Sequence, residues 1–172
     1  MPVSLVPDRV LRHYTDVTPR LLGELGVKLL LCDLDYTLAP RSVSAPDGAL
    51  RAWLDRCREA GVTVAILSNN RSPRRVEAFC GALGIWYVGH AGKPSVKGFR
   101  RAMDQAGAGP EETAMLGDKL LTDVLGARRS SVWALMVEPL GGPVGGWNRF
   151  LHLLQRPFKE ISKRRQNNHE QI

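Results

Sequence analysis

The twelve residues "LLLCDLDYTLAP" (29–40) decide the fold of this chain. Four apolar residues lead directly into Asp33 and Asp35, which only one residue separates. A segment that is apolar at every position predicts a strand buried on both faces, as in a parallel sheet. Two carboxylates this close repel each other and are costly to desolvate. The stretch therefore predicts a buried strand that ends at a site where a cation or a reaction compensates the charge.

The rest of the chain alternates between apolar runs and helical patterns, which is typical of βαβ units around a parallel sheet. The predicted strands are residues 27–33, 62–68, 85–88, 113–118 and 131–137. The predicted helices are residues 46–61, 72–84, 95–107, one between the last two strands, and 147–165. We expect an α/β fold, a three-layer α/β/α sandwich with about five parallel strands. Residues 1–140 would form this core, with a helical extension over 1–26, and residues 141–172 a basic C-terminal helix and tail.

Composition bounds the class of protein. The chain has 172 residues, 44% hydrophobic and 24% charged, which suits one globular domain. No apolar run approaches the roughly 20 residues that span a bilayer, and the N-terminus lacks a secretory pattern. Three cysteines without CxxC spacing predict reduced thiols. We therefore expect a cytoplasmic protein.

The net charge of +7 predicts an anionic partner, either nucleic acid or an acidic membrane surface. Residues 147–172 carry six Lys/Arg and two Glu. The predicted final helix, which we expect to kink or break at Pro157, has an apolar stripe of Trp147, Phe150, Leu151, Leu154 and Phe158. Such a helix can lie peripherally on an anionic membrane, here its inner face, or pack on the protein's own core. No recognised nucleic-acid motif is present, so we do not expect nucleic acid to be the ligand.

Polar residues follow the predicted strands at their carboxyl ends, where ligands bind in such sheets. They are Asp33, Asp35, Ser68, Asn69, Lys93, Asp118 and Asp123. They come from separate parts of the chain and would converge on one edge of the sheet. This convergence predicts a functional site.

The residue types indicate phosphoryl transfer. Asp33 can attack phosphorus and form an aspartyl-phosphate, while Asp35 can protonate the leaving oxygen and later activate water. Carboxylate and phosphate repel each other, so a divalent cation and a lysine must offset the charge. Asp33, Asp118 and the backbone carbonyl of Asp35 can supply oxygen ligands for Mg²⁺.

The remaining residues would support this chemistry. Ser68 and Lys93 can hold the phosphoryl group, and we expect Thr37 and Asn69 to help bind the substrate. Asp123 can orient Lys93 or a metal-bound water. As alternatives, Asp118 can cap a helix and Lys93 can be an ordinary surface lysine.

These segments resemble the haloacid-dehalogenase (HAD) phosphatases. "DLDYT" (33–37) resembles their DxDxT signature, and "LSNN" (67–70), "KP" (93–94) and "GDKLLTD" (117–123) resemble their next three motifs, in the same order. The resemblance implies a HAD-like Rossmannoid fold and Mg²⁺-dependent hydrolysis of phosphomonoesters. Taken together, the four motifs are a specific signal.

Longer stretches are similar to the YqeG-like branch of HAD subfamily IIIA. They are "DLDYTLAP" (33–40), "GDKLLTDVLGARR" (117–129) and the N-terminal segment 5–28. That branch is also similar to phosphatidylglycerophosphate phosphatases. The resemblance implies a lipid headgroup, phosphatidylglycerophosphate, as the leading substrate and a role in phospholipid biosynthesis.

Motif spacing bears on substrate size. Twenty-four residues lie between Thr37 and Val62, and another 24 between Ser68 and Lys93. Neither interval can hold a cap domain, so the sequence predicts an uncapped site. An uncapped site could accept a phosphate on a bulky partner such as a lipid at a bilayer.

Other functions stay open at this point. The chain could hydrolyse a soluble phosphometabolite. It could instead be a phospho-accepting receiver domain, which also combines acidic residues, a Lys and Mg²⁺ on a parallel sheet, or a nucleic-acid-binding domain. The spacing of Asp33 and Asp35 suits a nucleophile followed by an acid/base, and this favours the phosphatase.

Overall fold

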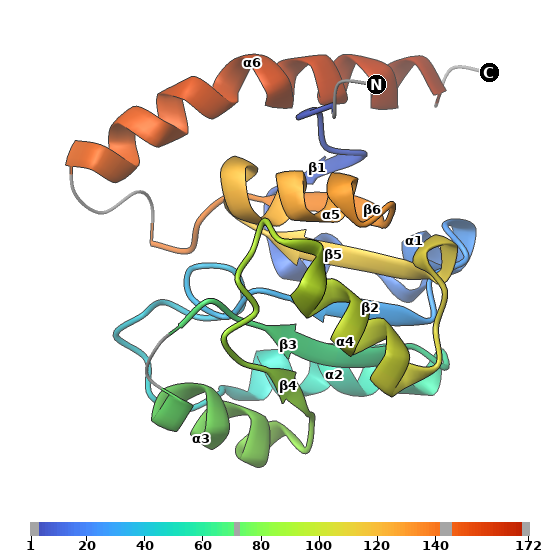
Figure 1. Cartoon of the computed structure of the whole chain (residues 1–172), viewed down its shortest axis with the longest axis vertical. Coiled ribbons are helices and arrows are strands. Elements are labelled where there is room, and N and C mark those ends of the chain that lie inside the picture. The colour runs from blue at the N-terminus through green and yellow to red at the C-terminus, as the bar shows by residue number, and fades with distance from the viewer. Residues whose placement is uncertain (1–3, 71–72, 142–145, 170–172) are drawn as a thin grey trace.

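One six-stranded parallel sheet organises the computed structural model, which describes residues 4–70, 73–141 and 146–169 (Figure 1). Its strands are β1 (Arg9–Leu11), β2 (Leu29–Cys32), β3 (Thr63–Leu67), β4 (Tyr87–Val88), β5 (Thr113–Gly117) and β6 (Trp133–Val137). The order across the sheet is β1-β6-β5-β2-β3-β4, and every neighbouring pair is parallel. β2 therefore lies between β3 and β5, and the "DLDYT" segment leaves the sheet near its centre.

Helices cover both faces of the sheet (Figure 1). α1 (Pro19–Glu24), α2 (Gly48–Glu59) and α3 (Pro73–Leu83) pack on one face, and α4 (Val96–Ala106) and α5 (Leu125–Arg129) on the other. Alternate residues of β2 supply the two cores: Leu30 and Cys32 point to the first face, Leu29 and Leu31 to the second. Because both faces are buried, every position of this strand is apolar. The predicted three-layer α/β/α fold is confirmed.

The sheet has six strands where about five were predicted, because the N-terminal extension is not purely helical. Residues 9–11 form β1 at the edge of the sheet, paired with β6. A three-residue strand is too short to show a period, so only its tertiary partners define it. Arg128 holds this segment, since its guanidinium donates to the carbonyl of Val6 and to the carboxylate of Asp8. The division of the chain at residue 140 stays a prediction.

The C-terminal helix α6 (Gly146–His169) continues through Pro157, so the predicted break is wrong, whereas a kink at Pro157 stays a prediction. Proline has no N–H, so the carbonyl of Leu153 loses its helical partner. Leu153 and Pro157 are both exposed, and water can therefore satisfy that carbonyl. No helix within the described ranges is long and apolar enough to cross a membrane.

Thiol chemistry tests the packing of the first core. Cys32, Cys57 and Cys80 are free and buried, and burial raises the pKa of Cys57 to about 11 and that of Cys80 to about 12. Little thiolate exists at pH 8, so we expect the native protein to resist iodoacetamide and the denatured chain to be alkylated at three sites. Intact-mass spectrometry measures this directly. Rapid alkylation of native Cys57 or Cys80 would contradict the packing.

Candidate active site

Asp33 directly follows β2, and its backbone adds one more hydrogen bond to the pairing of β2 with β5. The Asp33 N–H donates to the carbonyl of Leu116 at 2.9 Å. Its carboxylate contacts the ammonium groups of Lys93 at 2.9 Å and Lys119 at 3.5 Å. Burial acts to raise the pKa of Asp33, but the two lysines outweigh it and the pKa is lowered. Asp33 is therefore held as a carboxylate.

Lys93 bridges two buried carboxylates. Its Nζ lies 2.9 Å from Asp33 Oδ1 and 2.7 Å from Asp123 Oδ1. Burial would lower the pKa of Lys93, but these two partners raise it, so the ammonium stays charged. The side chain of Asn69 fixes the backbone here, since its Nδ2 donates to the carbonyl of Lys93 and its Oδ1 accepts from the N–H of Lys93.

Asp123 approaches the end of β5 because residue 117 is glycine. A Cβ on Gly117 would lie 2.3 Å from Asp123 Oδ2. That same oxygen accepts the N–H of Lys119 at 3.1 Å. Residues 120–124 form a single wide π-helical turn before α5, which returns Asp123 toward the sheet. Glycine at position 117 is thus a steric requirement of the site.

Three buried carboxylates form a cluster that fits a divalent cation. One oxygen from each of Asp33, Asp118 and Asp123 lies within 4.8 Å of the other two. Burial raises the pKa of Asp118 to about 6, partly offset by Lys119, and burial likewise raises the pKa of Asp123. Among the described residues, three carboxylates of this cluster contact only two ammonium groups, so one negative charge is not balanced. Hard oxygen donors that lack a cation suit Mg²⁺ and similar ions.

Lys119 lies within this cluster and had no role assigned from the sequence. Its Nζ contacts Asp118 Oδ1 at 3.1 Å and Asp33 Oδ2 at 3.5 Å. Its side chain is 44% exposed, so the ammonium reaches the cluster from the solvent side. Lys119 therefore places a positive charge between two of the predicted metal ligands.

Asp35 has a separate set of partners. Arg75 Nη1 donates to Asp35 Oδ1 at 2.6 Å, and Arg41 lies 3.7 Å from Oδ2. Asn70 Nδ2 contacts the same carboxylate at 3.4 Å. Tyr36, the next residue, takes the left-handed conformation with a φ of 66°, which turns the chain between Asp35 and the following loop.

Thr37 and Ser68 are both buried at this edge. Thr37 donates to Asp118 Oδ1 at 3.3 Å and is fully buried, so its observed contact is with a predicted metal ligand. Ser68 follows β3, and its Oγ accepts the N–H of Asn70 at 3.0 Å. Contacts of Thr37, Ser68 and Asn69 with substrate stay predictions.

The structure thus brings the predicted residues to one edge of the sheet, in two groups. Asp33, Lys93, Asp118 and Asp123 form a buried cluster, whereas Asp35 lies in a second group with Arg75 and Arg41. The two arginines were missed by sequence reasoning. They lie in a loop and in the first turn of α3, and no motif singles them out.

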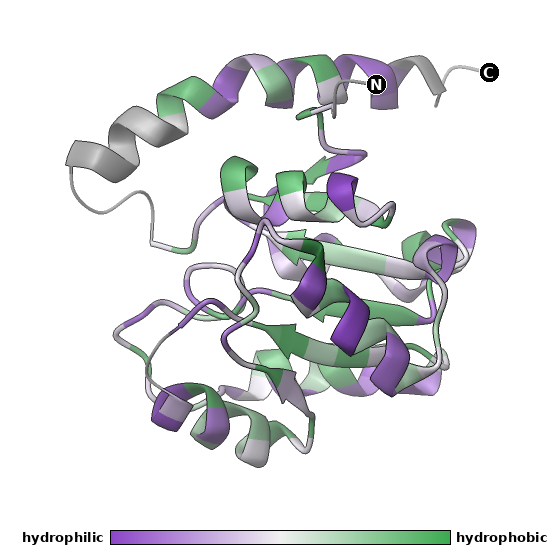
Figure 2. Ribbon diagram, in the orientation of Figure 1, coloured by the Kyte–Doolittle hydropathy of each residue, from purple (hydrophilic) through white to green (hydrophobic). Residues whose placement is uncertain are grey.

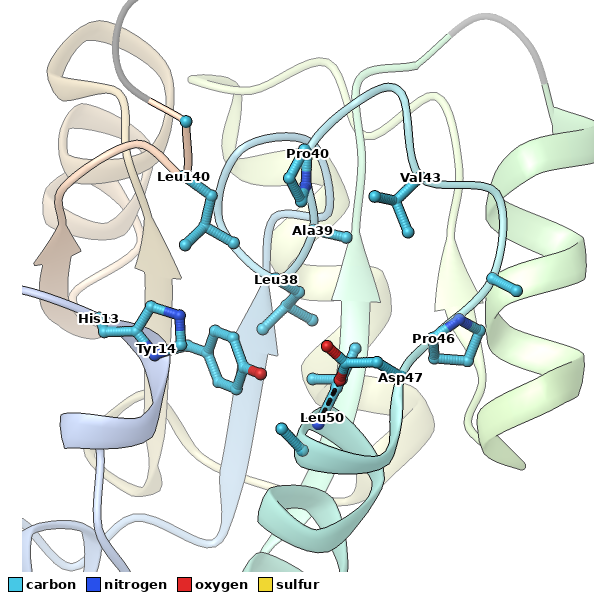
Figure 3. A pocket seen from close by; sticks show the side chains of 13 residues that line it. His13, Tyr14, Leu38, Ala39, Pro40, Val43, Pro46, Asp47, Leu50 and Leu140 are labelled. Atoms are coloured by element: carbon cyan, nitrogen blue, oxygen red, sulfur yellow. Dashed lines mark hydrogen bonds between the residues drawn. The ribbon is translucent and has the colours of Figure 1, made fainter.

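A cavity of about 330 Å³ lies next to the loop that follows Thr37 (Figure 3). Its walls include Leu38, Leu50 and Leu140, and the Tyr14 hydroxyl and Asp47 carboxylate face one another across it (Figure 3). Asp47 also accepts the N–H of Leu50 at the start of α2. No predicted site residue is among the described residues that line this cavity, so we assign it no part in the chemistry.

Comparison with known proteins agrees with this geometry. Probable phosphatase YqeG of Bacillus subtilis is 34% identical over 160 residues, which is 93% of this chain and 92% of that protein. Phosphoserine phosphatase of Thermus thermophilus is 36% identical over 97 residues, covering 51% of this chain and 38% of that protein.

A solved structure shares the fold. The cobalt-bound deoxy-D-mannose-octulosonate 8-phosphate phosphatase of Haemophilus influenzae has a TM-score of 0.54 at 17% identity and covers 80% of this chain and 92% of that one. The model of the haloacid dehalogenase-like hydrolases matches residues 11–130, well over half of the chain. The chain therefore belongs to the haloacid dehalogenase-like hydrolases, and it is a phosphatase.

Proposed function

We propose that the protein is a Mg²⁺-dependent phosphomonoesterase that acts through an aspartyl-phosphate on Asp33, with phosphatidylglycerophosphate as its substrate. The observation that carries the chemistry is the carboxylate of Asp33, held ionised between two lysines at the end of β2. An ionised carboxylate is the nucleophilic form. A soluble phosphomonoester is the alternative substrate, as the names of the Thermus and Haemophilus phosphatases illustrate.

The proposed reaction has two steps. An oxygen of Asp33 attacks phosphorus, the bond from phosphorus to the leaving oxygen breaks, and Asp35 gives that oxygen its proton. Asp35 then takes a proton from water as the water attacks the aspartyl-phosphate, which releases phosphate and restores Asp33. Lys93 and Ser68 hold the phosphoryl oxygens.

The metal would be held by Asp33, Asp118 and the backbone carbonyl of Asp35, with Asp123 orienting Lys93. When bound, Mg²⁺ supplies positive charge that offsets the repulsion between the nucleophile and the phosphate. The three buried carboxylates, whose oxygens lie within 4.8 Å of one another, support a divalent cation, and the preference for Mg²⁺ is part of the proposal.

An open site supports a bulky substrate. Between Thr37 and β3 the chain forms a loop and α2, and between Ser68 and Lys93 the described residues form α3 and β4. Neither segment folds over the carboxyl edge of the sheet as a separate domain in the described part of the chain. A phosphate on a large headgroup could therefore reach Asp33.

The orientation of α6 supports a membrane surface as the partner. Its inward side is polar, with Gln155, Lys159 and Ser162 buried against the body of the protein. Its outward side carries exposed Leu153, Leu154 and Ile161, at 58%, 50% and 44%. The basic residues Arg156, Lys163, Arg164 and Arg165 are exposed on the same helix. Figure 2 shows hydrophilic and hydrophobic residues alternating along the described part of α6. Apolar and basic side chains facing outward together suit an anionic bilayer.

Two residues of α6 face the protein, which agrees with the alternative that this helix packs on the core. Phe158 packs partly against the second core, and Lys159 is buried, where its Nζ lies 2.8 Å from Glu138 Oε2. The side chains of Trp147, Phe150 and Leu151 lie outside the described residues. We propose that the protein is cytoplasmic and peripheral at the inner membrane face through the outward side of α6.

Substitution of the two aspartates tests the chemistry. We expect Asp33→Asn to lower phosphate release from phosphatidylglycerophosphate vesicles by about three orders of magnitude or more, because an amide cannot form the intermediate. Asp35→Asn should slow release about a hundredfold or more, because protonation of the leaving oxygen is lost. Release is measured with Mg²⁺ and with a chelator, and circular dichroism checks the fold. Wild-type turnover by Asp33→Asn would refute the nucleophile, whereas turnover of aryl phosphate without lipid turnover would point to a soluble substrate.

Substitution of Lys119 tests the metal site without an activity assay. The ammonium competes with a cation for Asp33 and Asp118, so we expect Lys119→Gln to bind Mg²⁺ about tenfold more tightly by calorimetry. Lys28→Gln removes an exposed charge at the opposite end of β2 and should leave the dissociation constant unchanged. Unchanged or weaker binding by Lys119→Gln would show that its ammonium does not compete.

Vesicle binding tests the outward side of α6. Leu153→Glu should weaken co-sedimentation with anionic vesicles about tenfold, because an apolar contact is lost and a repelling charge gained. Lys163→Gln should have a smaller effect that disappears at high salt. Arg100→Gln, on the exposed side of α4, is the matched control for charge. Equal binding of all variants, or equal binding of wild type to neutral and anionic vesicles, would exclude this surface.

A further inference from the structure

Two arginines, Arg41 and Arg75, contact the carboxylate of Asp35. Arg75 lies in the first turn of α3, with Nη1 2.6 Å from Asp35 Oδ1, and its side chain is only 17% exposed. Arg41 follows Pro40 in the loop after β2, with Nε 3.7 Å from Asp35 Oδ2, and its side chain is 65% exposed. The proposed reaction gives neither arginine a task.

Arg75 is rigidly anchored. Its Nη2 donates to the carbonyls of Pro40 and Val43, both at 2.9 Å. Its guanidinium also lies 5.0 Å from the centre of the Phe79 ring. These contacts hold the guanidinium whether or not Asp35 accepts from it. Arg75 can therefore keep its position if another anion replaces Asp35.

The charges around Asp35 do not balance. Among the described residues, one carboxylate faces two guanidinium groups, and Asn70, a further partner, is neutral. The carboxylates of Asp33, Asp118 and Asp123 pair instead with Lys93 and Lys119. The Asp35 side of the site thus carries an excess positive charge that an incoming anion can neutralise.

The geometry of phosphoryl transfer says which part of the substrate meets this charge. Nucleophile and leaving group lie on opposite sides of phosphorus in an in-line displacement. Asp33 marks the nucleophile's side, and Asp35, as the proton donor, marks the leaving oxygen. Arg41 and Arg75 therefore lie beside the leaving alcohol and not beside the phosphoryl group.

We propose that Arg41 and Arg75 form a second anion-binding subsite, which selects phosphomonoesters whose leaving alcohol carries another negative group. The planar fork of a guanidinium matches the oxygens of a phosphate or phosphodiester. An anion at this subsite also competes with Asp35 for the hydrogen bonds of the two guanidinium groups, which frees its carboxylate for the leaving oxygen. This inference rests on the proposed function and narrows its substrate class. The phosphodiester of a phospholipid headgroup and the second phosphate of a soluble bisphosphate share this chemistry.

A matched pair of substrates tests the subsite. Propane-1,3-diol bisphosphate and propane-1,3-diol monophosphate differ only in the second phosphate, so the ratio of their kcat/KM values reports on it. We expect the wild-type ratio to favour the bisphosphate about tenfold or more, mainly through KM, and to fall as salt is added. A general loss of catalytic activity or of folded protein lowers both kcat/KM values equally, so it does not change their ratio.

Substitutions test whether the two arginines cause the preference for the bisphosphate. Arg41→Gln should lower the ratio of the kcat/KM values about threefold to fivefold, because it removes an exposed charge. Arg75→Lys keeps the charge but loses the fork, and should lower it about tenfold. Arg100→Gln removes an equal charge from α4 and should leave the ratio unchanged. A wild-type ratio near one, or a ratio that neither arginine variant changes, would overturn the subsite if the same variants also leave lipid hydrolysis unchanged, and the phosphatase would stay intact.

Two further arms separate the possible outcomes. If none of the diol phosphates, the aryl phosphate and phosphatidylglycerophosphate is hydrolysed in an Asp33-dependent way, the proposed function fails and the subsite with it. The same arginine variants are assayed on phosphatidylglycerophosphate vesicles with neutral carrier lipid. A loss on vesicles alone identifies the lipid phosphodiester as the second anion, and a loss on the bisphosphate alone identifies a soluble substrate.

Discussion

The buried contact of one ammonium with two carboxylates holds the site together. Lys93 lies between Asp33 and Asp123, and all three are almost fully buried. Removing one partner of such a group leaves an uncompensated charge, which costs about 3–5 kcal/mol. The contact joins three parts of the chain: the end of β2, the loop after β4 and the turn after β5. The site therefore forms only when the whole sheet edge is assembled.

This constraint extends to residues that carry no charge. Asn69 uses both polar atoms of its side chain to fix the backbone of Lys93. Gly117 leaves the space into which the Asp123 carboxylate fits. Thr37 is buried against Asp118. Each of these residues positions a charged neighbour or leaves space for it. This explains why small or neutral side chains lie so close to the charged residues of the site.

The charges of the site divide into two groups with different degrees of burial. Asp33 and Lys93 are desolvated, so their interaction is strong and insensitive to salt. Asp35 lies nearer the surface with Arg41 and Arg75, where an incoming anion can compete for the same guanidinium groups. In the proposed reaction, the more deeply buried Asp33 would receive the phosphoryl group, and the rest of the substrate would stay nearer the surface beside Asp35.

The sequence by itself determined the layered fold and the residues of the catalytic edge. Continuous apolar strands, capped helices and the "DLDYT", "LSNN" and "GDKLLTD" segments are local patterns, and each predicts its element without knowledge of the others. The sequence also predicted that Asp33, Lys93, Asp118 and Asp123 would meet, because the carboxyl ends of parallel strands share one edge. Only the tertiary structure decided the three features that depend on partners distant in sequence. β1 is defined by its pairing with β6, the arginines are defined by their approach to Asp35, and the buried side of α6 is defined by the surface beneath it. A local pattern cannot predict these features, because each depends on which surfaces the fold brings together.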